Sequence, residues 1–133
     1  MEQYQINGKT VSYDTFDLDN LAYYEQAARQ TAAQMQTLSE QVTDDNALDV
    51  LRQMCEEITG FFDAVLGEGM AHELFGDRLN VKTLGQAYTD FVRAVEAEKE
   101  KFAGHGLPAL PQLSRTSSVR RASLVKPDAG ETI

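Results

Sequence analysis

Two long stretches of the chain place apolar residues alternately three and four positions apart, which is the spacing of a helix face. The first stripe comprises Leu21, Tyr24, Ala28, Thr31, Met35, Leu38 and Val42, and the second comprises Leu48, Leu51, Cys55, Ile58, Phe62 and Val65. We predict one helix from about residue 19 to 43 and a second that begins after Asn46 and ends before Gly67. Because the connection between them is short, these helices should form an antiparallel hairpin.

A β-hairpin is predicted over residues 4–13. Tyr4 and Ile6 alternate with polar residues, as do Val11 and Tyr13, and the intervening Asn7-Gly8 suits the positive φ angles of a two-residue turn. A lone hairpin is only marginally stable in water. Its apolar face should therefore lie on the helices or on another subunit.

Glycine residues divide the second half of the chain. Gly67-Glu68-Gly69 should end the second helix in a turn with unusual φ angles, and residues 70–75 are long enough for one or two helical turns, closed by Gly76. A last helix is predicted over about 81–103, with Asn80 as a plausible cap. Its apolar face comprises Leu84, Tyr88, Phe91, Val95 and Phe102.

The last thirty residues have a different composition. All three prolines, Pro108, Pro111 and Pro127, fall within them, and no periodic apolar face continues. We expect disorder after about residue 114. The predicted fold is mainly α: an N-terminal β-hairpin and a small antiparallel bundle of three long helices and one short one over 1–103, followed by a flexible tail over 104–133.

The distribution of charge along the chain argues against some classes of binding partner. The net charge of the chain is −9, with residues 1–103 at −11 and residues 104–133 at +2. An acidic body is unfavourable for binding nucleic acid or an anionic membrane, and it favours solubility. No signal peptide is visible and no apolar run is long enough to span a bilayer. The single cysteine, Cys55, fits a reducing cytoplasm and excludes an internal disulfide.

Metal sites are weakly supported by the sequence. His72-Glu73 resembles part of a zinc-protease motif, but position 76 is Gly instead of the second His, and the other histidine is the distant His105. The Asp14, Asp17 and Asp19 cluster lacks the spacing of a calcium loop, so helix capping by Asp17 or Asp19 explains it better. We therefore expect no metal and no cofactor.

No catalytic arrangement is recognisable either, and we expect a protein that is not an enzyme. Cys55 lies on the second apolar stripe and should be a small core residue. Arg120-Arg121-Ala122-Ser123-Leu124 resembles a target of basic-directed protein kinases, in which a phosphate on Ser123 would change the charge of the tail. A solvated tail is the simpler interpretation of this short motif.

Two segments resemble a group of short proteins from long-tailed bacteriophages and Gram-positive prophages. One is INGKTVSYDTFDLDN (6–20), which precedes the first long helix. The stronger is ITGFFDAVLGEGMAHELFGDRLNVKTLGQAYTDFV (58–92), with an apolar pair, Gly-Glu-Gly, and a Phe-Gly closing a short helix. The resemblance covers about residues 4–95 and leaves the tail outside.

Proteins of this group resemble tail assembly chaperones, and the resemblance implies a function. The partners that the resemblance implies are the long, apolar tape measure protein and, as a second partner, the tail tube protein. Binding would take place in the cytoplasm of the bacterial host, and the protein would be absent from the mature virion. Chaperones of this kind are often made in a short and a frameshift-extended form. We expect the partner to bind in the grooves around the first two helices and at an apolar surface comprising Phe61, Phe62, Val65, Leu66, Met70, Leu74 and Phe75.

Two other functions remain open from the sequence. One is a minor structural or tail-completion component of the virion, and the other is a small phage regulatory protein that uses its basic tail as the contact. A homo-oligomer also remains open, because narrow helical seams can pair between subunits.

Overall fold

The computed structural model describes residues 1–103 and 122–125 of the chain. Its elements are β1 (Glu2–Ile6), β2 (Lys9–Tyr13), α1 (Leu18–Gln41), α2 (Ala47–Leu66), α3 (Met70–Phe75), α4 (Val81–Ala103) and β3 (Ala122–Val125). The predicted mainly α fold, with three long helices and one short one after a hairpin, is confirmed. Each predicted helix agrees with an observed one to within about two residues.

The hairpin forms where the sequence predicts it. β1 and β2 pair antiparallel with Tyr4 opposite Val11, and the turn between them has positive φ angles of 51° at Asn7 and 76° at Gly8. The Asn7 side-chain amide and the Lys9 ammonium donate hydrogen bonds to the carbonyl oxygen of Leu74, at 2.8 and 3.1 Å. The hairpin turn thus holds the C-terminal end of α3.

A third strand corrects the prediction for the tail. β3 pairs antiparallel with β2, with Ala122 opposite Tyr13 and Val125 opposite Thr10, so the sheet has the order β1-β2-β3. The expectation of disorder after about residue 114 is therefore wrong for residues 122–125. Four residues are too few to show an alternating pattern, and the free edge of β2 organises them. The rest of the predicted tail lies outside the described residues.

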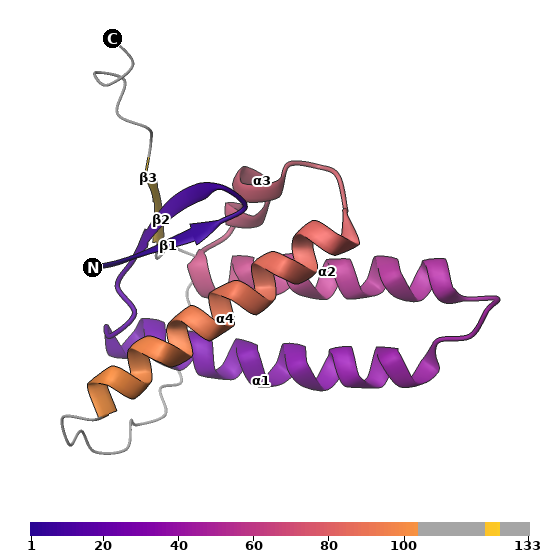
Figure 1. The fold of residues 1–133 in the computed structure, drawn as a ribbon, viewed down its shortest axis with the longest axis horizontal. Coiled ribbons are helices and arrows are strands. Elements are labelled where there is room, and N and C mark those ends of the chain that lie inside the picture. Colours follow the sequence, from indigo (N-terminus) through magenta and orange to yellow (C-terminus); the bar gives the residue numbers. More distant parts are fainter. Residues whose placement is uncertain (104–121, 126–133) are drawn as a thin grey trace, which may run out of the picture.

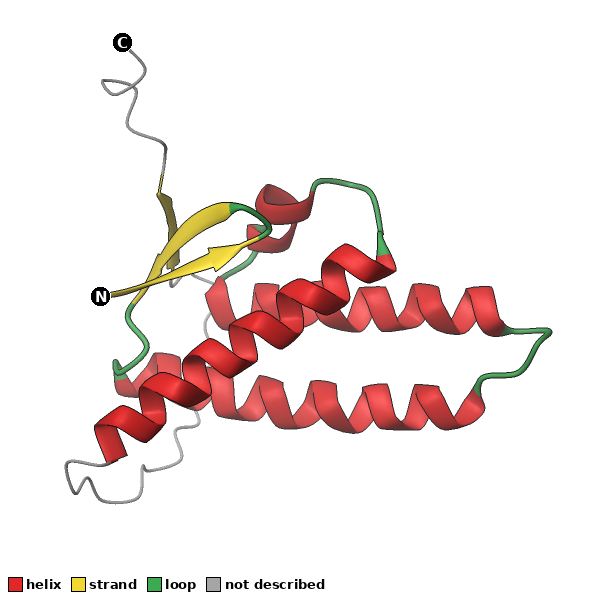
Figure 2. Cartoon of the chain, viewed as in Figure 1, coloured by secondary structure: helices red, strands yellow, loops and turns green. Residues whose placement is uncertain are grey.

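The helices are arranged in two layers (Figures 1 and 2). α1 and α2 run side by side as the predicted antiparallel hairpin, and α4 crosses them diagonally. The sheet and α3 lie at one end of the hairpin, and the loop between α1 and α2 extends away from them. This loop end of the hairpin is thus the part of the helices farthest from the sheet.

The core is centred on an aromatic cluster around Phe91 of α4. The rings of Tyr4, Tyr13, Tyr24, Phe61 and Phe62 lie 5.1–6.4 Å from the Phe91 ring, centre to centre. These residues come from both strands of the hairpin and from α1 and α2. One side chain on α4 therefore joins the sheet to the helical hairpin.

Polar side chains stabilise the helix ends. The Asp17 carboxylate accepts hydrogen bonds from the backbone N–H groups of Asp19 and Asn20 at the start of α1, and the Asn80 side-chain oxygen accepts one from Thr83 N–H at the start of α4. Both predicted caps are confirmed. At the start of α3, the Asp63 carboxylate accepts from the backbone N–H of Ala71 at 2.8 Å.

Gly67 has a backbone conformation that should not tolerate a side chain. It ends α2 with φ 122° and ψ 154°, a region that is nearly restricted to glycine, and we expect Gly67→Ala to cost about 1–3 kcal/mol. Gly60→Ala is the matched control, because Gly60 is helical and its added Cβ meets nothing within 4 Å. This change should stabilise by about 0.5–1 kcal/mol in urea unfolding. Equal effects of the two changes would rule out the proposed backbone strain.

Candidate partner-binding site

The surface that the sequence predicts for a partner is the core of the molecule. Phe61, Phe62, Val65, Leu66, Met70 and Leu74 are each at most 2% exposed. Phe75 is half-buried, with its ring 5.3 Å from that of Phe62. The six buried side chains cannot contact a partner while the domain is folded, so the prediction is wrong for them, and among the seven predicted residues only Phe75 keeps part of its side chain exposed. The helical spacing of these residues predicts an apolar face, but it does not predict that other elements of the same chain cover that face.

The predicted stripes are instead exposed at the loop end of the hairpin. Leu48 is 73% exposed and Leu51 is 38% exposed, and Val42 at the end of α1 is also exposed. Val50 occupies the buried position of this part of α2 instead. The face of α2 that the core covers near Phe62 is thus left open at its N-terminal end.

Leu48 and Leu51 line an apolar groove between two segments. Leu48, Leu51, Arg52 and Cys55 contribute from α2, and Leu79 and Val81 contribute from the connection to α4 and its first residue. The groove has a volume of about 140 Å³. Its α2 wall presents residues at i, i+3 and i+7, the spacing with which one helix face meets another. An apolar groove open to solvent is typical of a binding surface.

Cys55 forms the base of this groove. The sequence prediction that it is an interior residue is confirmed, because its side chain is buried. Burial raises the pKa of the Cys55 thiol, and the nearby Arg52 charge opposes this shift. A protonated, buried thiol is a weak nucleophile, so Cys55 contributes apolar surface to the groove.

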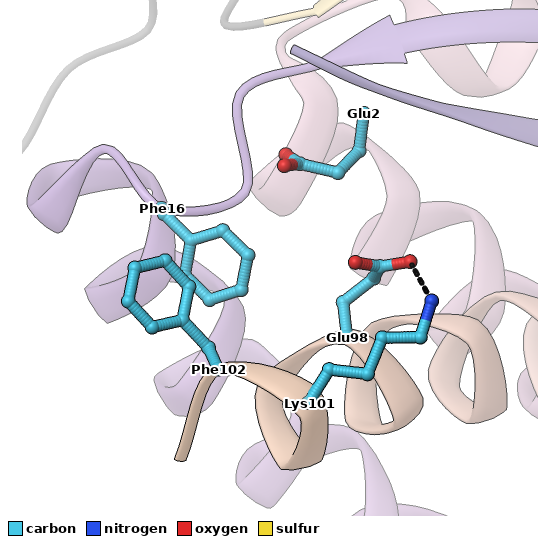
Figure 3. A pocket seen from close by; sticks show the side chains of 5 residues that line it. All are labelled: Glu2, Phe16, Glu98, Lys101 and Phe102. Carbon is cyan, nitrogen blue, oxygen red and sulfur yellow. Dashed lines mark hydrogen bonds and ion pairs between the residues drawn. The ribbon is translucent and has the colours of Figure 1, made fainter. Parts of the chain in front are cut away.

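A larger pocket lies at the opposite end of α4 (Figure 3). Glu2, Phe16, Glu98, Lys101 and Phe102 line its volume of about 410 Å³. The rings of Phe16 and Phe102 are 4.4 Å apart, and Lys101 pairs with Glu98 at 3.4 Å. The first described segment ends at residue 103, directly after Phe102. The candidate partner site is placed at the groove near Leu48, whose lining residues all lie within the described chain and include exposed residues of the predicted stripe.

A polar network joins α1 to α4. The Tyr24 hydroxyl donates to the Glu96 carboxylate at 2.9 Å, and Lys99 pairs with Glu25 and, at 3.3 Å, with Glu96. Burial, reinforced by Glu96, raises the pKa of Tyr24. Burial lowers the pKa of Lys99, but the hydrogen bond and charge of Glu25 outweigh it, so the net shift is upward. Each group has a partner, so the network acts as an interhelical clamp.

The other residues that the sequence analysis considered for metal binding have local structural roles or lie outside the described residues. His72 lies on the surface, where its Nδ1 is 2.9 Å from Asp77 Oδ1, and His105 lies outside the described residues. Within residues 1–103 and 122–125, no group of three or more His, Cys, Asp or Glu side chains is placed to hold a metal ion. Asp17 is a helix cap, as described above.

Two further sequence features have a structural outcome. Gly67 and Gly69 both have positive φ angles, which confirms the predicted turn between α2 and α3. Ser123 of the kinase-like motif lies in β3, and Arg120 and Arg121 lie outside the described residues. No helix among the described residues is long and apolar enough to cross a membrane.

Together these features define a mainly helical domain with a three-stranded antiparallel sheet and an open apolar groove at the end of its helical hairpin. The chain belongs to a family of unknown function, DUF6673, which matches residues 7–122. The match spans β2, all four helices and the first residue of β3. No curated protein and no solved structure matches the chain significantly.

Proposed function

We propose that this protein is a phage tail assembly chaperone-like protein that binds helical segments of the tape measure protein in the host cytoplasm. The sequence resemblance described above suggests this function. The observation that carries it is the open apolar groove formed by Leu48, Leu51 and Cys55 on α2 with Leu79 and Val81.

A charged protein can keep an apolar helix in solution by covering its apolar face. Isolated helices with an apolar stripe aggregate, because two copies remove their stripes from water by packing them against each other. Seating part of that stripe in the groove removes it from water, and the net charge of −11 on residues 1–103 keeps the complex dispersed. Assembly of the tail tube would then displace the chaperone, so the interaction needs to be reversible.

Two substitutions in the groove test this function. Leu48→Ser with Leu51→Ser should weaken binding of the tape measure protein about 10-fold or more, because each buried leucine contributes about 1–3 kcal/mol. Stability should fall by only about 1 kcal/mol, mainly at Leu51, since Leu48 is 73% exposed and Leu51 is 38% exposed in the free protein. The measurement is co-purification and solubility of the tape measure protein of the same phage, co-expressed with each variant.

The matched control is Leu18→Ser with Phe102→Ser, which removes exposed apolar side chains at the start of α1 and near the end of α4, outside the groove. This variant should solubilise the tape measure protein as the unmodified chain does. Failure of the unmodified chain to bind or solubilise the tape measure protein would refute the proposal. Stoichiometric amounts of the protein in purified virions, detected by mass spectrometry, would instead support a structural tail component.

A further inference from the structure

The groove is bordered by basic residues on an otherwise acidic body. Arg52 lines it from α2, while Arg78 and Lys82 flank its opposite wall, directly before Leu79 and directly after Val81. All three are exposed. They are three of only eight basic residues in residues 1–103, which also hold 19 acidic ones. Asp49 and Glu56, which follow Leu48 and Cys55, offset much of this charge on α2, so the excess of basic residues lies on the wall formed by Leu79 and Val81.

These cations are not used by the fold. No ion pair joins Arg52, Arg78 or Lys82 to an acidic side chain within the described part of the chain. Asp77, which precedes Arg78, is paired with His72. In contrast, Lys99 is bound by Glu25 and Glu96. The groove therefore presents cations that are available to carboxylates of a ligand.

A second copy of this chain is a poor occupant for the groove. In a two-fold symmetric contact the same patch meets itself, which would bring the basic border of one copy against that of the other. The two bodies would also each carry a net charge of −11 over residues 1–103. An apolar helix with carboxylates beside its stripe would instead bring acidic side chains against the basic residues. Its repulsion from the acidic rest of the body is limited, because salt screens charges that are more than about 10 Å apart.

We propose that this groove is a receptor for an amphipathic helix whose apolar stripe is bordered by Asp or Glu side chains. The leucines of α2 and the wall at Leu79 and Val81 receive the stripe, and Arg78 and Lys82 beside that wall pair with the carboxylates. The inference rests on the proposed function in that it uses the same groove, and it names the chemistry by which the groove selects among apolar helices.

The test uses three synthetic helical peptides with one fluorescent label, measured by anisotropy against the full chain. The first has a leucine stripe at helical spacing bordered by Glu, the second has the same stripe bordered by Lys, and the third has the Glu border with Ser in place of the stripe. We expect the first to bind about 10-fold more tightly than the second at low salt, with the ratio falling as salt rises. The third should not bind.

Charge reversal in the protein provides the matched comparison. Arg78→Glu with Lys82→Glu should reverse the preference between the Glu- and Lys-bordered peptides. Arg29→Glu with Arg93→Glu makes the same change of net charge at exposed positions on α1 and α4 and should leave the preference unchanged. Circular dichroism confirms that both variants remain folded.

Three results would overturn the inference. They are equal affinity for the Glu- and Lys-bordered peptides, the same loss of preference in both charge variants, and self-association of the protein that blocks the peptide. The outcome is separable from that of the proposed function. Binding of the tape measure protein without a charge preference refutes only this inference, whereas preference for the Glu-bordered peptide without binding of the tape measure protein refutes only the chaperone function.

Discussion

Replacing Phe91 by alanine is expected to cost about 3–5 kcal/mol of unfolding free energy, a large part of the stability of a domain of this size. Phe91 is 1% exposed, and its ring contacts aromatic rings from β1, β2, α1 and α2. Its removal leaves a cavity where the sheet, the helical hairpin and α4 meet. Five aromatic neighbours held by four elements cannot collapse freely into that space. The measurement is the free energy of unfolding in urea.

Phe102→Ala is the control for this prediction, because it removes the same side chain from the same helix. Phe102 is 38% exposed and its close aromatic contact is with Phe16 alone among the described rings. The expected loss is about 1 kcal/mol. If the two substitutions destabilise the protein equally, the core is not organised around Phe91.

Ending the chain at residue 121 is expected to destabilise it by about 2–3 kcal/mol relative to a chain that ends at residue 125. The shorter chain lacks β3, which pairs with β2 over four residues and buries Ala122 beside it. Each lost hydrogen bond of the ladder contributes about 0.5–1.5 kcal/mol, and the lost apolar contacts add to this. The exposed edge of β2 should also promote self-association.

Urea unfolding and sedimentation of the two truncated chains measure both effects. The chain that ends at residue 125 is the matched control, because it lacks only residues 126–133. Equal stability and equal monomer content of the two chains would show that β3 does not contribute to the fold.

The strand β3 also affects how the regulatory alternative is tested. Deletion of residues 114–133 would remove β3 together with the basic residues of the tail. Arg120→Ala with Arg121→Ala is therefore the better test of a function of the basic tail.

Local features of the sequence predicted most elements of the fold. The Asn7-Gly8 turn, the Asp17 and Asn80 caps and the glycines after α2 act within a few residues of the chain. The three-four spacing of apolar residues likewise depends on the geometry of a single helix. These signals are therefore present in the sequence before any tertiary contact forms, which is why the helix limits and the hairpin were predictable.

The strand β3 and the candidate binding site depended on contacts between distant segments. Residues 122–125 become a strand because they pair with the edge of β2, and a segment of four residues has no sequence pattern that predicts this pairing. Phe62 and Leu48 belong to one predicted stripe, yet the first is buried and the second is 73% exposed.

The sequence by itself determined the helices, the N-terminal hairpin, the turns and the acidic character of this protein, because propensity, capping and charge are properties of neighbouring residues. Only the tertiary structure decided which end of α2 is covered and which remains open as a groove. The physical reason is that burial depends on which other elements pack against a face. Here α3 and α4 pack against α2 at Phe61 and Phe62, while its N-terminal end at Leu48 and Leu51 stays exposed.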